Sequence, residues 1–245
     1  MKVLSCLMAF CLISLHAFPW QTVERSRLTD NWFVNLSTGC YAHSSHTVVF
    51  RHLNPSITIG IGRYLTPVYG LELQSTAAFD DGPDGTENGL AVKQSFLLLN
   101  HHINLNHLIC GYNGRPDIFE IIATAGLGWQ HSFEKHPTDY RTTNNLASRF
   151  ALQFTYNPGC KRAWQLFLEP SLTYEMKGTS TDYQPYFNVN RSQIGLSVGV
   201  AYRFKNSNGT HHFKWARLYD QVEVDALNAK INELRRQLRQ KQKSL

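Results

Sequence analysis

Residues 192–204 alternate strictly between apolar side chains and small or polar ones, which is the periodicity of a β-strand. A strand in a soluble sheet usually has about 5–6 residues, whereas about 9–11 are needed to cross a bilayer at a tilt. This alternation is long enough to cross a bilayer, and Tyr202 and Phe204 place aromatic rings at the end of its apolar face. Such a pattern is typical of a strand that crosses a membrane.

The N-terminus has the features of a secretory signal peptide. Lys2 precedes an apolar run that is too short to span a bilayer as a helix, and Ala17 supplies a small residue at the cleavage point. We therefore assign residues 1–17 to a signal peptide and 18–30 to an N-terminal lead. The formal net charge of +6 arises largely from the C-terminal tail. Because an exported chain seldom meets nucleic acid, we expect no nucleic-acid partner.

Eight segments show the period of two between turn or loop signals, and they predict one all-β domain over residues 31–204. Their bounds are 31–41, 56–64, 68–79, 90–105, 118–131, 146–156, 164–176 and 192–204. The links after the first, third, fifth and seventh segments are long and polar, while those after the second and sixth are short. This asymmetry predicts an eight-stranded antiparallel transmembrane β-barrel, with long outer loops and short periplasmic turns.

The two parities of these segments predict which residues face lipid and which face the interior. Six aromatic residues share the apolar parity near the strand ends, where they would form two interfacial girdles: Trp32, Trp129, Tyr156, Trp164, Tyr174 and Phe204. Six charged residues are assigned to the interior: Arg63, Glu72, Glu120, Arg149, Glu169 and Arg203. Side chains just fill a barrel of eight strands, so we expect these charges to pair rather than to line a pore.

The chain changes character after the last segment. Residues 205–215 are polar and predict a hinge, and residues 216–245 predict an amphipathic periplasmic helix or short coiled coil. Apolar residues recur there at spacings of three and four: Leu227, Ile231, Leu234 and Leu238. The basic face could lie on an anionic membrane surface or stay solvated. The apolar residues need a partner to bury them, so we expect homo-oligomers through the tail.

Several short motifs, in their order along the chain, resemble outer-membrane proteins of the OmpA type from Bacteroides-like bacteria. They are residues 31–34 (NWFV), 110–113 (CGYN), 126–129 (GLGW), 202–204 (YRF) and 206–210 (NSNGT). The helix over 225–236 resembles the periplasmic linker of that family. In the family this linker leads into a peptidoglycan-binding domain, and here the sequence ends at Leu245. The aromatic last strand resembles the signal that the barrel-assembly machinery recognises.

Reactive side chains do not form a pattern that predicts catalysis, a metal or a cofactor. Histidines of the first outer loop (His43, His46 and His52) have no carboxylate or cysteine at ligand spacing. The interior glutamates lack an exposed Ser or His at a matching strand end, so a salt-bridge network is the better interpretation. Cys110 and Cys160 both fall in predicted periplasmic links, where a disulfide is chemically permitted. Cys40 has the lipid-facing parity and is expected to be a small apolar residue.

The sequence therefore predicts a non-catalytic structural protein of the outer membrane, with its loops outward and its tail in the periplasm. Expected partners are outer-membrane lipid and the barrel-assembly machinery. Three alternatives remain: a small barrel enzyme acting on lipid or peptide, a narrow porin or surface ligand-binding barrel, and a soluble ligand-carrying barrel. The soluble barrel would need the apolar face inside, where two aromatic belts would have no purpose.

Overall fold

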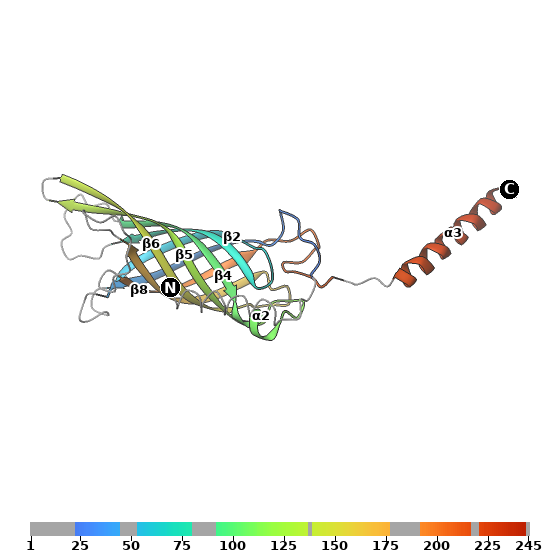
Figure 1. Ribbon diagram of the computed structural model, residues 1–245, viewed down its shortest axis with the longest axis horizontal. Helices are drawn as coiled ribbons and strands as arrows, with labels where there is room; N and C mark the ends of the chain where they lie inside the picture. The colour runs from blue at the N-terminus through green and yellow to red at the C-terminus, as the bar shows by residue number, and fades with distance from the viewer. Residues whose placement is uncertain are drawn as a thin grey trace, which may run out of the picture.

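The computed structural model describes residues 23–44, 53–79, 92–136, 139–176, 192–216 and 221–243. Eight antiparallel strands close into one barrel in sequence order (Figure 1). They are β1 (Trp32–His43), β2 (Asn54–Tyr64), β3 (Tyr69–Phe79), β4 (Val92–Asn104), β5 (Phe119–His136), β6 (Asp139–Tyr156), β7 (Trp164–Met176) and β8 (Ser192–Arg203). The predicted class, an eight-stranded antiparallel barrel followed by a C-terminal helix, is confirmed. The predicted signal peptide lies outside the described residues.

Pairing of the first strand with the last closes the barrel. In this pairing Leu36 of β1 lies opposite Val200 of β8, and Phe33 lies opposite Arg203. Closure gives every strand of the wall two neighbours, so the wall has no edge strand. We call the rim where β1 begins and β8 ends the terminal end, and the opposite rim the loop end.

The connection between β5 and β6 differs from the prediction. The polar residues from 132 to 145 were expected to form a loop, but residues 132–136 and 139–145 continue the two strands. Pairing runs on from Gln130 opposite Asn145 to His136 opposite Asp139. Figure 1 shows this hairpin reaching beyond the other strands at the loop end. A hairpin outside the barrel wall needs no apolar face, so the alternation that marks the wall gives no signal for it.

Burial follows the alternation in the wall. On β2, Ile57, Ile59 and Ile61 point outward and are about half exposed, while Thr58 is buried inside. The six predicted girdle residues all lie on the outward face. Trp32, Tyr156, Trp164 and Phe204 are at the terminal end, and Trp129 and Tyr174 are toward the loop end.

A short helix, α2 (Leu105–Cys110), fills the link between β4 and β5 that is too long for a tight turn. Asn104 ends β4 and caps this helix, since its side chain accepts a hydrogen bond from the His107 amide at 3.1 Å. Gly111 follows the helix with a positive φ of 81°. The helix thereby carries His107 from the wall into the barrel mouth.

The tail forms the helix α3 (Gln221–Lys243), which Figure 1 shows apart from the barrel. Its four heptad leucine and isoleucine residues are between 46% and 63% exposed. Among the helices of the described chain, none is long and apolar enough to cross a membrane. The helix therefore has an apolar stripe that nothing in the described chain covers.

Candidate functional site: the barrel interior and its closed end

An ion pair joins the neighbouring strands β6 and β7 inside the barrel. Arg149 Nη2 lies 2.5 Å from Glu169 Oε1, and both side chains are buried. Arg149 Nη1 also donates to Gln74 Oε1 on β3 at 2.6 Å. Three strands are thus joined across the interior by one guanidinium.

A second cluster centres on Glu72 of β3, which is 2% exposed. Its Oε1 accepts from Asn35 Nδ2 at 2.6 Å, and its Oε2 lies 2.5 Å from His102 Nε2. Asn100 donates to Glu72 at 3.4 Å and to Gln74 at 2.7 Å, which links this cluster to the Arg149 pair. A Cβ on Gly60 would lie 1.9 Å from Glu72 Oε1, so only glycine leaves room for the carboxylate there.

A third cluster lies at the terminal end around Glu120 of β5, which is 1% exposed. Glu120 Oε2 accepts from Asn157 Nδ2 at 3.0 Å and from Arg203 Nη2 at 3.4 Å. Its Oε1 lies 3.0 Å from His107 Nε2. The Arg203 guanidinium also stacks over the Tyr64 ring, 5.0 Å from its centroid.

Two histidines complete these clusters, although sequence reasoning did not place them there. His102 sits on the inward parity of β4, and that parity was a signal that could have identified it. His107 comes from α2 and had no such signal. Its Nδ1 lies 2.8 Å from the Pro67 carbonyl. Each of the three buried glutamates therefore has an arginine or histidine partner, and this pairing stabilises the interior instead of leaving a reactive group exposed to substrate.

Arg63 does not belong to the interior network, and the expectation that it does is wrong. It has the same parity as Ile61 on β2 and therefore points outward. Its Nε donates to the Asp30 carbonyl at 3.0 Å, and its Nη2 donates to the Arg27 carbonyl at 2.7 Å. Arg63 thus anchors the N-terminal lead to the outside of the terminal rim.

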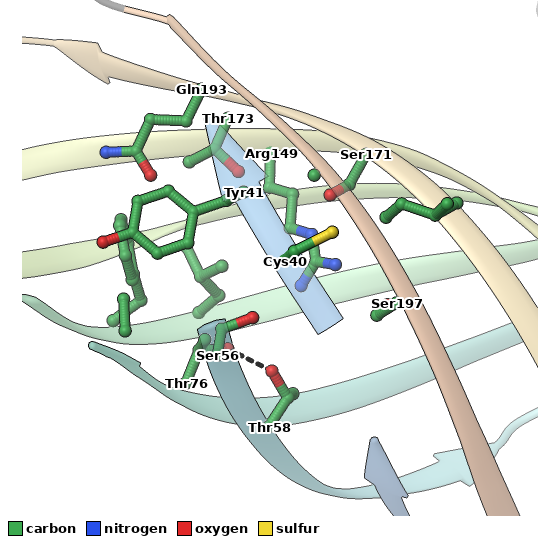
Figure 2. A pocket seen from close by; sticks show the side chains of 15 residues that line it. Cys40, Tyr41, Ser56, Thr58, Thr76, Arg149, Ser171, Thr173, Gln193 and Ser197 are labelled. Carbon is green, nitrogen blue, oxygen red and sulfur yellow. Dashed lines mark hydrogen bonds between the residues drawn. The ribbon is translucent and has the colours of Figure 1, made fainter. Parts of the chain in front are cut away.

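A small cavity remains on the loop-end side of the Arg149 pair (Figure 2). It encloses about 50 Å³, and its lining mixes hydroxyl groups with apolar side chains such as Phe96 and Leu98. Thr58 and Thr76 share a hydrogen bond of 2.8 Å on one side of it. Arg149 Nε is buried there with no protein partner. The space is sufficient for a few water molecules, which would satisfy this nitrogen.

The segment predicted as a hinge is instead folded against the terminal end, and we call residues 205–216 the strap. Asn206 Oδ1 accepts from the Asn31 amide at 2.7 Å, and Asn206 Nδ2 donates to Asn31 Oδ1 at 2.7 Å. Ser207 donates to Asp30 through both its amide and its hydroxyl, at 2.8 and 2.7 Å. The polar composition of this segment predicted a hinge. Its partners could not be recognised, because they lie far away in the sequence.

An aromatic cluster seals this end of the barrel beneath the strap. Phe213 is buried against Phe33, Tyr64 and Tyr112. Tyr112 donates its hydroxyl hydrogen to the Phe213 carbonyl at 2.8 Å. Trp215 forms a β-bridge with Val23 of the N-terminal lead. The terminal end is therefore closed by side chains and by a segment of the chain itself.

The strap should loosen on acidification through His212. Burial, with a smaller contribution in the same direction from nearby positive charges, Arg203 first among them, lowers the pKa of His212 to about 4. The folded chain favours the neutral form of His212, and this contribution to the stability of the strap is fully present above the unfolded pKa near 6.5. It is lost as the pH falls from there toward 4, because protonation is then favoured in the unfolded chain. We expect pH-corrected hydrogen exchange of strap peptides to speed up over this range in the wild type. The His212→Leu variant should lack this component, and an identical pH profile for the two chains would contradict the assignment.

Within the part of the chain that the structure describes, the other reactive residues do not gather into a site. Cys40, Cys110 and Cys160 are all free, and the last two are exposed. Over the described ranges, no three His, Cys, Asp or Glu residues are arranged to hold a metal ion. His46 and His52 lie outside those ranges.

Comparison with known proteins identifies solved structures that have a similar barrel fold. No protein-family model matches the chain, and no curated protein matches its sequence. Among solved structures, Neisserial surface protein A (NspA) is 12% identical with a TM-score of 0.53, covering 74% of this chain and 100% of NspA. The N-terminal β-barrel domain of Pseudomonas aeruginosa OprF is 13% identical with a TM-score of 0.45, over 71% of this chain and 97% of that one. A major outer membrane protein of Thermus thermophilus is 13% identical with a TM-score of 0.39, over 71% and 99%. The chain has the barrel fold of NspA.

Proposed function

We propose that this chain is a non-catalytic structural protein of the bacterial outer membrane. The observation that carries the proposal is the inversion of the barrel: aliphatic side chains bounded by aromatic rings cover its outside, and buried polar groups fill its inside. Such a surface is stable in lipid and would aggregate in water. The soluble ligand-carrying barrel would need the opposite arrangement.

The closed interior favours a structural role over a porin or an enzyme. The buried glutamates are tied to Arg149, Arg203, His102 and His107, and the strap with Phe213 covers the terminal end. A pore would need a continuous polar lumen, and general acid–base catalysis would need two groups held around an accessible substrate bond. The cavity in the described interior has room for a few water molecules but not for a substrate.

The finer parts of the proposal follow from chain topology. The loop end would face outward and the terminal end, with the strap and α3, would face the periplasm, because short turns belong to the periplasmic side. The motif resemblance to OmpA-type proteins supports the same orientation. Phe204, exposed at the end of the last strand, would be read by the barrel-assembly machinery.

Two measurements test the proposal together. Folded small barrels resist SDS, so detergent-extracted protein should migrate faster on an unheated gel than after boiling. Membrane fractionation of cells that express the full chain should place that fast band with the outer membrane. Identical mobility before and after boiling, or recovery in the soluble fraction, would refute the proposal.

We further propose that α3 self-associates, with a second copy of the chain as the partner. Leu227, Ile231, Leu234 and Leu238 follow the heptad spacing, and all are exposed. A lone helix of this length is marginal in water, whereas barrels tethered in one membrane raise the effective concentration of their tails. Repulsion between basic residues such as Arg235 should make the complex weak and favoured by salt.

Chemical crosslinking in membranes should therefore give dimers or trimers of the full chain. These products should disappear for the double variant Leu227→Asp with Leu234→Asp, because charges at heptad positions cannot be buried together. A chain ending at Ala216 keeps the strap and should also stay monomeric. Equal crosslinking of that shortened chain would place any association in the barrel wall.

A further inference from the structure

The short helix α2 has two faces of opposite character. Figure 1 shows it at the terminal end, where β4 stops. Its inward face carries His107, which is 5% exposed and has Nε2 3.0 Å from Glu120 Oε1. At 3.6 residues per turn, Leu105, Leu108 and Ile109 share the opposite face. The apolar side of α2 therefore points away from the barrel mouth.

The side chain of Asn106 fixes the level of α2 on the barrel. Its Nδ2 donates to the Phe119 carbonyl at 3.1 Å, and its Oδ1 accepts from the Ile121 amide at 2.9 Å. Asn106 thus takes the place of a β4 backbone beside β5, after β4 has ended. The register partner of Phe119 is Tyr156 of β6, a member of the aromatic girdle. The helix α2 therefore begins at the level of that girdle.

Phe119 joins the outward face of α2 to the girdle. Its ring stacks on that of Tyr156, with the centroids 5.0 Å apart and the planes tilted by 33°. Phe119 is 68% exposed and Ile109 is 72% exposed, whereas Tyr156 is 41% exposed. Large apolar side chains that are this exposed, beside an aromatic girdle, indicate contact with an apolar partner. We call this surface the shelf, and it consists of Leu105, Leu108, Ile109 and Phe119.

We propose that the shelf is a membrane-interface anchor that lies in the leaflet at the terminal end. Its partner is the boundary between lipid head groups and acyl chains, where an amphipathic helix buries its apolar face about 5–10 Å deep. Tyr156 marks the same boundary on the wall, because aromatic girdles lie at membrane interfaces. Lipid holds the apolar side of α2 while Glu120 holds the His107 side, so a helix of only six residues stays folded. This inference rests on the proposal that the barrel spans a membrane.

A spin label can measure what surrounds the shelf. The label is attached at Ile109→Cys in a mature chain that also carries Cys40→Ala, Cys110→Ser and Cys160→Ser, refolded into phosphatidylcholine vesicles. Collisions of the label with oxygen, which concentrates in lipid, are compared with collisions with a water-soluble nickel complex. The ratio of oxygen to nickel accessibility should be several times higher at residue 109 than for a label on the native Cys160, which is exposed in the β6–β7 turn. A label at Phe119→Cys should give the same high ratio as Ile109→Cys.

A label in the girdle, at Trp164→Cys, separates failure of the anchor from failure of the barrel. Equal ratios at Ile109→Cys and Cys160, with a high ratio at Trp164→Cys, would overturn the anchor and leave the membrane barrel intact. A low ratio at Trp164→Cys as well would overturn the membrane-spanning barrel itself. Low accessibility of residue 109 to both probes would mean that protein covers the shelf, and this too would overturn the anchor.

Hydrogen exchange tests whether lipid holds α2 in place. Ile109→Ser removes the apolar contact, and serine has about the same intrinsic helix propensity as isoleucine, so propensity does not explain a change. The amides of α2 should exchange several times faster in vesicles of this variant than in those of the wild type. Asn113→Ser, an exposed position in the same link beyond the helix, should leave the exchange of α2 unchanged. Wild-type exchange in the Ile109→Ser chain would contradict a lipid contact that supports α2.

Discussion

Replacing Arg149 with leucine is expected to destabilise the barrel by about 3–5 kcal/mol, the usual cost of leaving one buried charge without its partner. Glu169 would lose the guanidinium that lies 2.5 Å away, and Gln74 would lose a donor. The free energy of unfolding can be measured by urea titration of the vesicle-embedded barrel, followed by gel mobility and tryptophan fluorescence.

The paired replacement separates a lost partner from lost volume. Arg149→Leu combined with Glu169→Leu removes both charges, so its cost should be far smaller than that of Arg149→Leu alone. If the double variant is as unstable as the single one, then packing around Arg149, and not its charge, supports the interior.

A charge on the outward apolar wall should have an effect of similar size. Leu168 is 46% exposed near the middle of β7 and points outward. Leu168→Arg should cost about 2–4 kcal/mol, because a cation near the bilayer midplane loses its hydration. The measurement is the same urea titration in lipid vesicles.

Position in the bilayer, and not the arginine itself, should determine this cost. Leu65 lies in the turn between β2 and β3 at the terminal rim and is equally exposed at 44%. Leu65→Arg should therefore cost about 0–1 kcal/mol, as expected near an interface. Equal stability of the Leu168→Arg chain and the wild type would mean that the outward face of β7 does not meet lipid.

Most of the wall could be predicted because alternation is a local property of each strand. The predicted ends of β2 at Tyr64 and of β7 at Met176 coincide with the structure. Prediction failed outside the barrel wall, where strands need no apolar face. The β5–β6 hairpin extends beyond the wall, and the helix α2 forms where a loop was expected. Backbone pairing and capping determine those elements, and neither leaves a period of two in the sequence.

The interior could be predicted only by parity. Glu72, Glu120 and Glu169 were assigned correctly to the inside because each alternates with outward-facing neighbours. Their partners depend on the curvature that brings β3 to β6 and α2 to β5, which no local pattern encodes. The strap was missed for the same reason, since Asn206 and Asn31 are 175 residues apart in sequence and lie together only in the closed barrel.

The strap also determines which contacts would break first if a force were applied to the tail. Tension applied along α3 reaches Trp215 first, where the bridge to Val23 and the bond from the Glu24 amide to the Lys214 carbonyl, 2.8 Å long, join strap and lead. Behind them lie the Asn206 and Ser207 bonds, and only then the seam between β8 and β1. A load on the tail must therefore shear several short polar links in turn before it can peel the last strand from the first. Force applied to the tail would thus break contacts at the terminal rim first, and the pairing of β8 with β1 that closes the wall would be spared.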